Sequence, residues 1–219
     1  MNCTATKGPG ASKSVSGETK RLTCMLKSAA HALVSHPWVY DKVQSLAGVG
    51  RVLDRMAPHM KKTLGEVVLD IGGGTGNVLS VVPSPGKYIW LDNDPLKLQG
   101  FRRKHPSLTG ILGDATKIPL RDKSVDNVLC MFVLHHLTDD QLSLFFAEVA
   151  RVVKKTFILV DPVERKTSIV SRLLWNYDRG SNPRSVETLH AAMSARFDIE
   201  HTERFAVLHE YLICVGHPL

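Results

Sequence analysis

Apolar residues follow two different periods along the chain, and the change between the periods divides it into two parts. From Leu22 to Val34 they recur at spacings of three, four, seven and eight, which predicts an amphipathic helix. A second short helix through Val39 and Leu46 is predicted to end at Gly48 or Gly50. Residues 1–19 are rich in glycine, serine and lysine and are expected to form a flexible tail, so the N-terminal helical extension spans residues 20–63.

After residue 64 the chain changes to short apolar runs separated by turns and helical stretches. This alternation is typical of a parallel sheet with crossover helices, which gives one α/β domain over residues 64–219. Helices are predicted at Pro95–His105 and Gln141–Val153, and a helical insert at about residues 164–195 includes a helix from Ser185. The predicted strands are Val67–Ile71, Tyr88–Leu91, Thr109–Leu112, Val125–Met131, Thr156–Asp161, Phe197–Glu203 and Tyr211–Val215.

The composition is that of a globular protein, with 43% apolar and 22% charged residues in 219. No apolar run approaches the roughly 20 residues that cross a bilayer. The net charge of +7 is N-terminal, since ten Lys/Arg and three Asp/Glu precede residue 64 and 18 of each follow it. This basic end suits peripheral contact with an anionic membrane, and a solvated tail is the alternative. Four cysteines without paired spacing and no secretory signal lead us to expect a cytoplasmic protein.

A glycine turn provides the main chemical signal. The run from Val67 to Gly76 reads VVLDIGGGTG, an apolar strand that leads directly into a turn and then a helix. Glycines are needed at such a turn because it requires unusual dihedral angles and because side chains would keep a ligand away from the backbone. A Gly-rich turn can also be only a tight connection between a strand and a helix, so its position beside other polar residues decides its meaning.

Polar residues end the next three predicted strands. Asp92 ends the second, where an acid can accept both hydroxyls of a ribose, and Asp114 follows the third, where a carboxylate can meet an adenine amino group. The fourth is followed by His135 and His136. Each has a structural alternative. Asp92 could form a turn, Asp114 could cap a helix, and the two histidines could belong to a hydrogen-bonded loop. Their joint occurrence at strand ends favours a ligand site, because ligands of open parallel sheets bind at that edge.

With these motifs the sequence resembles the class I S-adenosylmethionine-dependent methyltransferases, specifically over about residues 64–161. It is most similar to the small-molecule branch that includes the quinone-biosynthesis C-methyltransferases. The resemblance implies a Rossmann-like, doubly wound, seven-stranded sheet of order 3-2-1-4-5-7-6 with the last strand antiparallel. One departure is a short segment after Gly76, which reaches only Val82 before Pro83 and implies an abbreviated or irregular first crossover.

The resemblance also implies roles for individual residues around S-adenosylmethionine. Those around the methionine part are Asp70, Gly72, Gly74 and Phe132. Tyr40, an aromatic residue of the N-terminal helices, is separately expected to close over the donor, and core packing is the alternative. Those around the adenosine are Asp92 at the ribose and Asn93, Asp114 and Ala115 at the adenine.

Methyl transfer is a displacement at a carbon that the donor itself activates, so the protein mainly positions the reactants. A base is needed only when the acceptor must lose a proton, and His135 and His136 are the candidates; the alternative is that they hydrogen-bond the backbone. They are not expected to bind a metal, because adjacent side chains point apart and no third ligand is evident. The acceptor cavity is expected under the N-terminal helices and the insert. Its candidate residues are Trp38, Trp175, Tyr177 and Arg179.

The expected acceptor is a small molecule, such as a lipophilic or aromatic metabolite. Nucleic acid is disfavoured because Met131 to Leu134 stand where base-amino methyltransferases carry an Asn/Asp-Pro-Pro-aromatic segment. Protein or RNA methylation, and a non-catalytic adaptor that keeps the fold, are the alternatives. A nicotinamide oxidoreductase is another, but Asn77 stands where its fingerprint places the third glycine.

Overall fold

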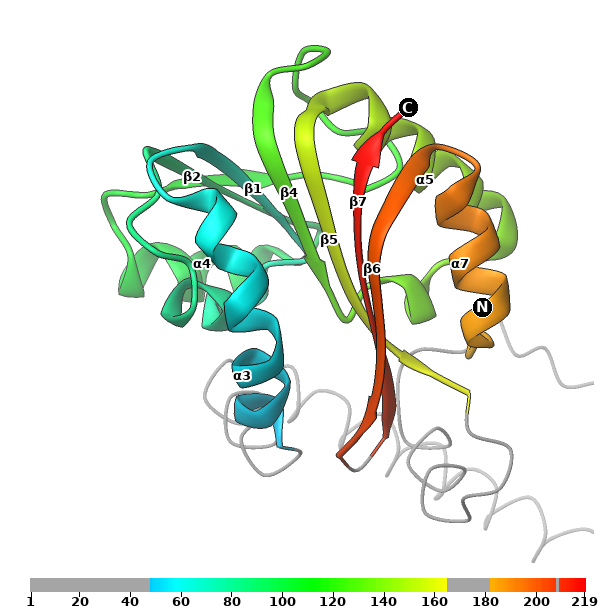
Figure 1. Cartoon of the computed structure of the whole chain (residues 1–219). Coiled ribbons are helices and arrows are strands. Elements are labelled where there is room, and N and C mark those ends of the chain that lie inside the picture. Colours follow the sequence, from blue (N-terminus) through cyan, green and yellow to red (C-terminus); the bar gives the residue numbers. More distant parts are fainter. Residues whose placement is uncertain (1–47, 165–181, 208) are drawn as a thin grey trace, which may run out of the picture.

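A seven-stranded sheet forms the centre of the protein in the computed structural model, which describes residues 48–164, 182–207 and 209–219 (Figure 1). The strand order is β3-β2-β1-β4-β5-β7-β6, as predicted. Strands β1 to β5 pair in parallel, and β7 is antiparallel to both β5 and β6. The strands are β1 Val67–Ile71, β2 Lys87–Asp92, β3 Thr109–Leu112, β4 Val125–Met131, β5 Val153–Val163, β6 Phe197–Ala206 and β7 Glu210–Pro218.

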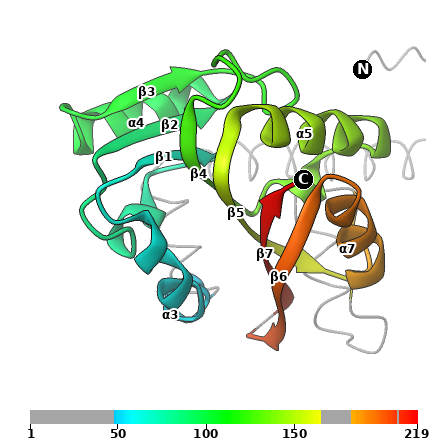
Figure 2. The same cartoon turned by 45° about the horizontal axis from the view of Figure 1, so that its top comes forward.

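Helices cover both faces of the sheet, with α3 and α4 on one face and α5 and α7 on the other (Figures 1 and 2). Asp94 caps the N-terminus of α4, and Thr138 forms a capping box with Gln141 at the start of α5. The α-helices are α3 Val49–Met60, α4 Pro95–Lys104, α5 Asp139–Val152 and α7 Val186–Ser194. The 3-10 helices are η1 Lys61–Thr63, η2 Asn77–Ser80 and η3 Leu134–His136. In the described part of the chain, every helix is too short or too polar to cross a membrane.

Each face of the sheet has its own apolar core. Under α5 and α7, Phe145 of α5, Phe157 of β5 and Phe197 of β6 belong to one core, which also includes apolar residues of β4. The opposite core contains Met56 of α3 and Phe101 of α4. It also contains alternate residues of β7, namely Tyr211, Ile213 and Val215. The central strands are therefore buried on both sides, which explains why they read as continuous apolar runs in the sequence.

Two buried thiols lie at the centre of the sheet. Cys130 of β4 and Cys214 of β7 pair with Leu159 of β5 from its two sides, and all three belong to the core under α5 and α7. Both thiols are free, and burial raises the pKa of each above its ordinary value.

The main difference from the prediction concerns the segment before β1. Gly48 and Gly50 were expected to end a helix, whereas Gly48 adopts a left-handed conformation at the N-cap of α3, and Gly50 lies inside that helix. Glycine can begin a helix as well as end one. The short first crossover is confirmed, because only the 3-10 helix η2 follows Gly76. The predicted tail and the first N-terminal helix lie outside the described residues, as does the part of the insert at 165–181.

Candidate functional site

The site predicted from the sequence lies at the carboxyl edge of the parallel strands. Because β1 lies between β2 and β4, the segments that follow these three strands are neighbours. They are the glycine turn at residues 72–76, the acidic end of β2, and the loop that begins at Phe132. Such an edge is where open α/β sheets bind ligands.

The first glycines of the turn pack too closely against their neighbours to carry a side chain. Gly72 has φ 70°, and a Cβ atom there would lie 2.2 Å from Val133 Cγ2 in the loop after β4. The Gly72 N–H donates to the Leu91 carbonyl oxygen at 2.7 Å, which ties the turn to β2. Gly74 accepts a hydrogen bond from Trp90 Nε1 at 3.1 Å. The requirement for glycine here therefore comes from both conformation and space.

Asp92 holds the turn from the end of β2. Its Oδ2 accepts the Gly74 N–H at 3.1 Å, and its Oδ1 accepts the Asp94 N–H at 3.0 Å. Lys97 Nζ lies 3.7 Å from Oδ2, and only 4% of Asp92 is exposed. An ionised carboxylate has about four acceptor positions, so Asp92 retains capacity for further donors. The neighbouring Asn93 is exposed.

Asp70 is a second buried acid close to the turn. Its Oδ2 accepts a hydrogen bond from the Tyr88 hydroxyl, whereas its Oδ1 has no hydrogen-bond partner among the described residues. Burial, with a smaller contribution from the negative charge of Asp92, raises the pKa of Asp70 to about 7. Burial and Asp70 in turn hold the pKa of Tyr88 well above its ordinary value. The Tyr88 hydrogen bond opposes the shift of Asp70 without cancelling it.

The end of β3 is more open. Asp114 is exposed, and its Oδ1 accepts hydrogen bonds from the Thr116 N–H and the Thr116 hydroxyl, both at 2.8 Å. These bonds form a local turn, whereas the structural alternative predicted for Asp114 was a helix cap. Ala115 is half-buried and packs on the core under α5.

Phe132 begins the loop after β4 in a left-handed conformation, with φ 62°. Its ring lies 5.5 Å from that of Tyr211, measured between centroids. With Met131 it lines a small hollow against Gly72, Gly73 and Gly74. Phe132 and the glycine turn, which the resemblance assigns to the methionine end of the donor, are thus brought together.

Asp161, at the carboxyl end of β5, organises the next residues of this loop. Its Oδ2 accepts the N–H groups of Val133 at 2.9 Å and Leu134 at 2.8 Å. Its Oδ1 accepts the His135 N–H at 3.2 Å and lies 2.9 Å from His135 Nδ1. Only 1% of Asp161 and 5% of His135 are exposed. The sequence analysis did not identify Asp161, although its position at the end of a buried strand matches that of Asp92.

The two candidate bases differ in their surroundings. His135 is buried against Asp161, whereas His136 is exposed. The expectation that adjacent side chains point apart is wrong here, because the two ring centroids are 4.0 Å apart. Both histidines belong to the single 3-10 turn η3, Leu134–His136, within which the two rings approach each other.

Arg184 also holds this loop, and it was not among the site residues predicted from the sequence. The guanidinium donates to the carbonyl oxygens of Leu134 at 2.8 Å and Leu137 at 2.7 Å. It also pairs with Asp139 Oδ1 at 2.8 Å. Arg184 is buried, with an exposed fraction of 7%, whereas the Asp139 side chain is exposed. Asp161 and Arg184 together fix the segment that carries both histidines.

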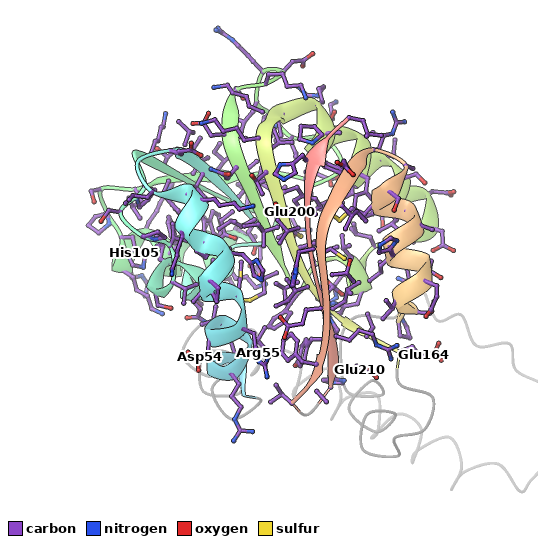
Figure 3. The ribbon with its side chains drawn as sticks, in the orientation of Figure 1. Asp54, Arg55, His105, Glu164, Glu200 and Glu210 are labelled. Atoms are coloured by element: carbon purple, nitrogen blue, oxygen red, sulfur yellow. The ribbon has the colours of Figure 1, made fainter. Side chains whose placement is uncertain are left out.

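A cavity of about 520 Å³ adjoins the glycine turn on the side of α3. Thr75, Gly76 and Asn77 form one wall, and the start of α3 forms another. His105 at the end of α4 also lines it and is labelled in Figure 3. The predicted contact residues Trp38, Tyr40, Trp175, Tyr177 and Arg179 lie outside the described residues.

Comparison with known proteins agrees with this geometry. Residues 68–156 match the family described as "Methyltransferase domain". A methyltransferase of Geobacillus is 28% identical over 93 residues, which are 42% of this chain and 44% of that protein. The demethylmenaquinone methyltransferase of Renibacterium salmoninarum is 34% identical over 91 residues, which are 41% and 38% of the two chains. The chain thus spans about half or less of the curated relatives that it matches.

Solved structures share the fold. A protein of Pyrococcus horikoshii superposes with a TM-score of 0.66 at 20% identity, covering 78% of this chain and 91% of its own. An S-adenosylmethionine-dependent methyltransferase of Methanosarcina mazei also gives 0.66, at 16% identity, covering 74% and 97%. The domain match and the curated relatives identify residues 68–156 as a methyltransferase domain, and the strand order agrees with the class I S-adenosylmethionine-dependent fold that the resemblance implies.

Proposed function

We propose that the chain binds S-adenosylmethionine over the glycine turn and transfers its methyl group to a small molecule. The observation that carries the proposal is the pairing of the three successive glycines at residues 72–74 with the buried carboxylate of Asp92. A ligand can approach the backbone at this turn, and Asp92 retains acceptor capacity for ribose hydroxyls. Asn93, Asp114 and Ala115, at the ends of β2 and β3, are proposed to contact the adenine.

The charges around the turn suit a cationic ligand. The donor carries a sulfonium and an ammonium group, and the carboxyl groups of Asp70 and Asp92 lie close enough to influence each other electrostatically. The Oδ1 atom of Asp70 is buried and has no partner among the described residues, so a nearby cation would relieve an unsatisfied acceptor. A dinucleotide would instead bring two phosphates to this acidic edge, which disfavours the oxidoreductase alternative.

The loop after β4 is proposed to face the methyl group. When bound, the donor supplies a methyl group that its sulfonium activates for displacement. Phe132 would shield this end of the donor from water. Asp161 holds Nδ1 of His135, so Nε2 is the nitrogen turned away from the carboxylate and is proposed to take a proton from an acceptor that must lose one. His136 is the exposed alternative to His135 in this role.

A small-molecule acceptor is favoured by the sequence at the end of β4, where Met131 to Leu134 lack the segment that holds a flipped base. The name of one relative, demethylmenaquinone methyltransferase, gives a small lipophilic acceptor for that protein. We therefore propose a lipophilic or aromatic metabolite as the acceptor class of this chain.

Calorimetric titration of the whole chain with S-adenosylmethionine, its demethylated product and NAD tests donor binding. We expect saturable binding of the first two, and a weakening of about 1 to 3 kcal/mol in Asp92→Asn from the lost acceptor capacity. Asp140→Asn, at an exposed carboxylate in the first turn of α5, is the matched control. A preference for NAD, or equal donor affinity in both variants, would contradict the proposed site.

The acceptor class is tested with isotopically labelled donor. The chain is incubated separately with metabolite, protein and RNA fractions of one extract, and the label is followed into each. We expect the label in the metabolite fraction. Transfer to protein or RNA would favour those acceptors, and tight donor binding without transfer to any fraction would favour a non-catalytic adaptor.

A further inference from the structure

Three potential metal ligands lie together between α3 and β6, away from the glycine turn. They are His59 in the last turn of α3 and His201 and Glu203 of β6. One ligand atom from each side chain lies within 4.8 Å of the other two, and all three residues are half-buried. His59 and His201 are 142 residues apart in the sequence, so only the fold brings them together.

A β-bulge places the two β6 residues on the face of α3. Ile199 pairs with Gly216 and His201 pairs with Val215, so Glu200 is the extra residue. Before the bulge, Ile199 packs on the core under α7; beyond it, Phe205 packs on the core under α3. The bulge therefore transfers the odd-numbered side chains of β6 from one face of the sheet to the other. Bulges commonly redirect side chains in this way at functional sites.

Arg55 orients the carboxylate of the cluster. Its Nη1 donates to Glu203 Oε1 at 2.8 Å, which leaves Oε2 on the side of His201, 3.9 Å from His201 Nε2. The Arg55 guanidinium also lies 5.9 Å from the centre of the Phe205 ring. Figure 3 labels Arg55 between α3 and β6 and labels Glu200 on β6. Glu200 is engaged elsewhere, with Lys62 and with His217 Nε2, so the ligand set is two imidazoles and one carboxylate.

One ring nitrogen of His201 lacks a hydrogen bond. Nε2 of His201 is buried and has no hydrogen bond within residues 48–164, 182–207 and 209–219. The ring of His59 lies 4.6 Å from that of His201, measured between centroids. Buried polar atoms normally have a hydrogen-bond partner, and a role in binding an ion is one recognised reason for an exception.

We propose that His59, His201 and Glu203 bind a divalent transition-metal ion of the zinc class. Two imidazole nitrogens and one carboxylate oxygen suit Zn²⁺, which takes such ligands at about 2.0 to 2.2 Å and leaves a fourth position for water. Tetrahedral ligands at that length are about 3.4 Å apart. The ligand atoms would move together by about 1 Å, which side-chain rotation can supply at a half-buried site.

The ion would fasten the last turn of α3 to β6. His59 lies ten residues after Val49, which lines the cavity beside the glycine turn, so the two sites are about 15 Å apart along the helix. The metal would therefore act on the position of α3 and not on the donor. It would fix the helix whose first turn forms a wall of that cavity.

The test uses the whole chain after treatment with a chelator, titrated with Zn²⁺ by calorimetry and with Co²⁺ by visible absorption spectroscopy. We expect one high-affinity ion per chain and the strong visible bands of tetrahedral Co²⁺. His59→Gln and His201→Gln should each lower the affinity at least about tenfold. His190→Gln, on α7 across the sheet, is the control and should bind as the unmodified chain does.

Circular dichroism of each variant verifies that it folds, and Glu203→Gln provides a third ligand change at a position less buried than the core. Binding that both histidine variants retain would assign the metal to other residues and overturn the proposal. Absence of tetrahedral Co²⁺ bands in the unmodified chain would also overturn it and would show that the cluster is an ion-pair network. Since no donor is present in the titration, neither result depends on the proposed methyl transfer.

Discussion

Replacing Asp70 with asparagine should remove a pH dependence of the stability that the buried acid creates. The pKa of Asp70 is about 7 in the folded protein and 3.8 in its ordinary, unfolded state. Between these values the folded state binds more protons than the unfolded state, so the free energy of unfolding falls as the pH rises towards about 7. The full difference of about three pKa units corresponds to about 4 kcal/mol.

About 2 to 3 kcal/mol of this total is lost between about pH 5 and about pH 8, because the remainder is lost below about pH 5, where the carboxyl group of the unfolded chain already ionises. The charged or titratable groups that act on Asp70 are the Tyr88 hydroxyl, Asp92 and, more distantly, Cys130. Asparagine stays neutral throughout and can still accept the Tyr88 hydrogen bond. The Asp70→Asn variant should therefore become more stable relative to the unmodified chain as the pH rises.

Urea denaturation at several pH values measures this difference, with Asp140→Asn as the control for loss of an exposed carboxylate. We expect the stability difference between Asp70→Asn and the unmodified chain to change by about 2 to 3 kcal/mol over that range. Parallel pH profiles for the two proteins would refute the reasoning, because they would mean that Asp70 is ionised in the folded state at about pH 5.

Three further predictions concern the loop after β4. Asp161→Ala leaves three backbone N–H groups without their acceptor and should lower the free energy of unfolding by at least about 3 kcal/mol in urea; a loss below about 1 kcal/mol would contradict this. His135→Gln should slow methyl transfer by about 10²- to 10⁴-fold at unchanged donor affinity, and an unchanged rate would limit His135 to holding the loop. Arg184→Met should speed amide hydrogen exchange in residues 133–139, measured by mass spectrometry, without a comparable change in β1.

The sequence predicts the core of the fold well because the central strands are buried on both faces. Strands β1, β3 and β4 have the predicted bounds, and the capped helices α4 and α5 differ by one or two residues. Strands β6 and β7 are longer than predicted, because they continue as an antiparallel pair beyond their most apolar residues. The beginning of α3 was missed because Gly48 was taken as a helix end.

The candidate site was predictable only where its residues adjoin a strand end. Asp92 follows an apolar run directly. Asp161 instead binds a loop that lies 26 to 28 residues earlier in the sequence, so its role is not visible from its neighbours in the chain. The contacts of Arg184 span 45 to 50 residues, and no local pattern marks them. The cluster around His201 depends on a bulge in β6. A bulge moves the following side chains to the other face of the sheet, and the alternation of residue types along the strand does not reveal it.

Alkylation of the two thiols beside Leu159 can report how often the centre of the sheet opens. Cys130 and Cys214 are shielded in the native state, and a reagent can reach them only when the strands around β5 separate. The rate at which peptides containing these cysteines become alkylated therefore measures how often the strands around β5 separate. The same measurement on any variant separates a local loosening of the ligand edge from a rupture of the whole domain.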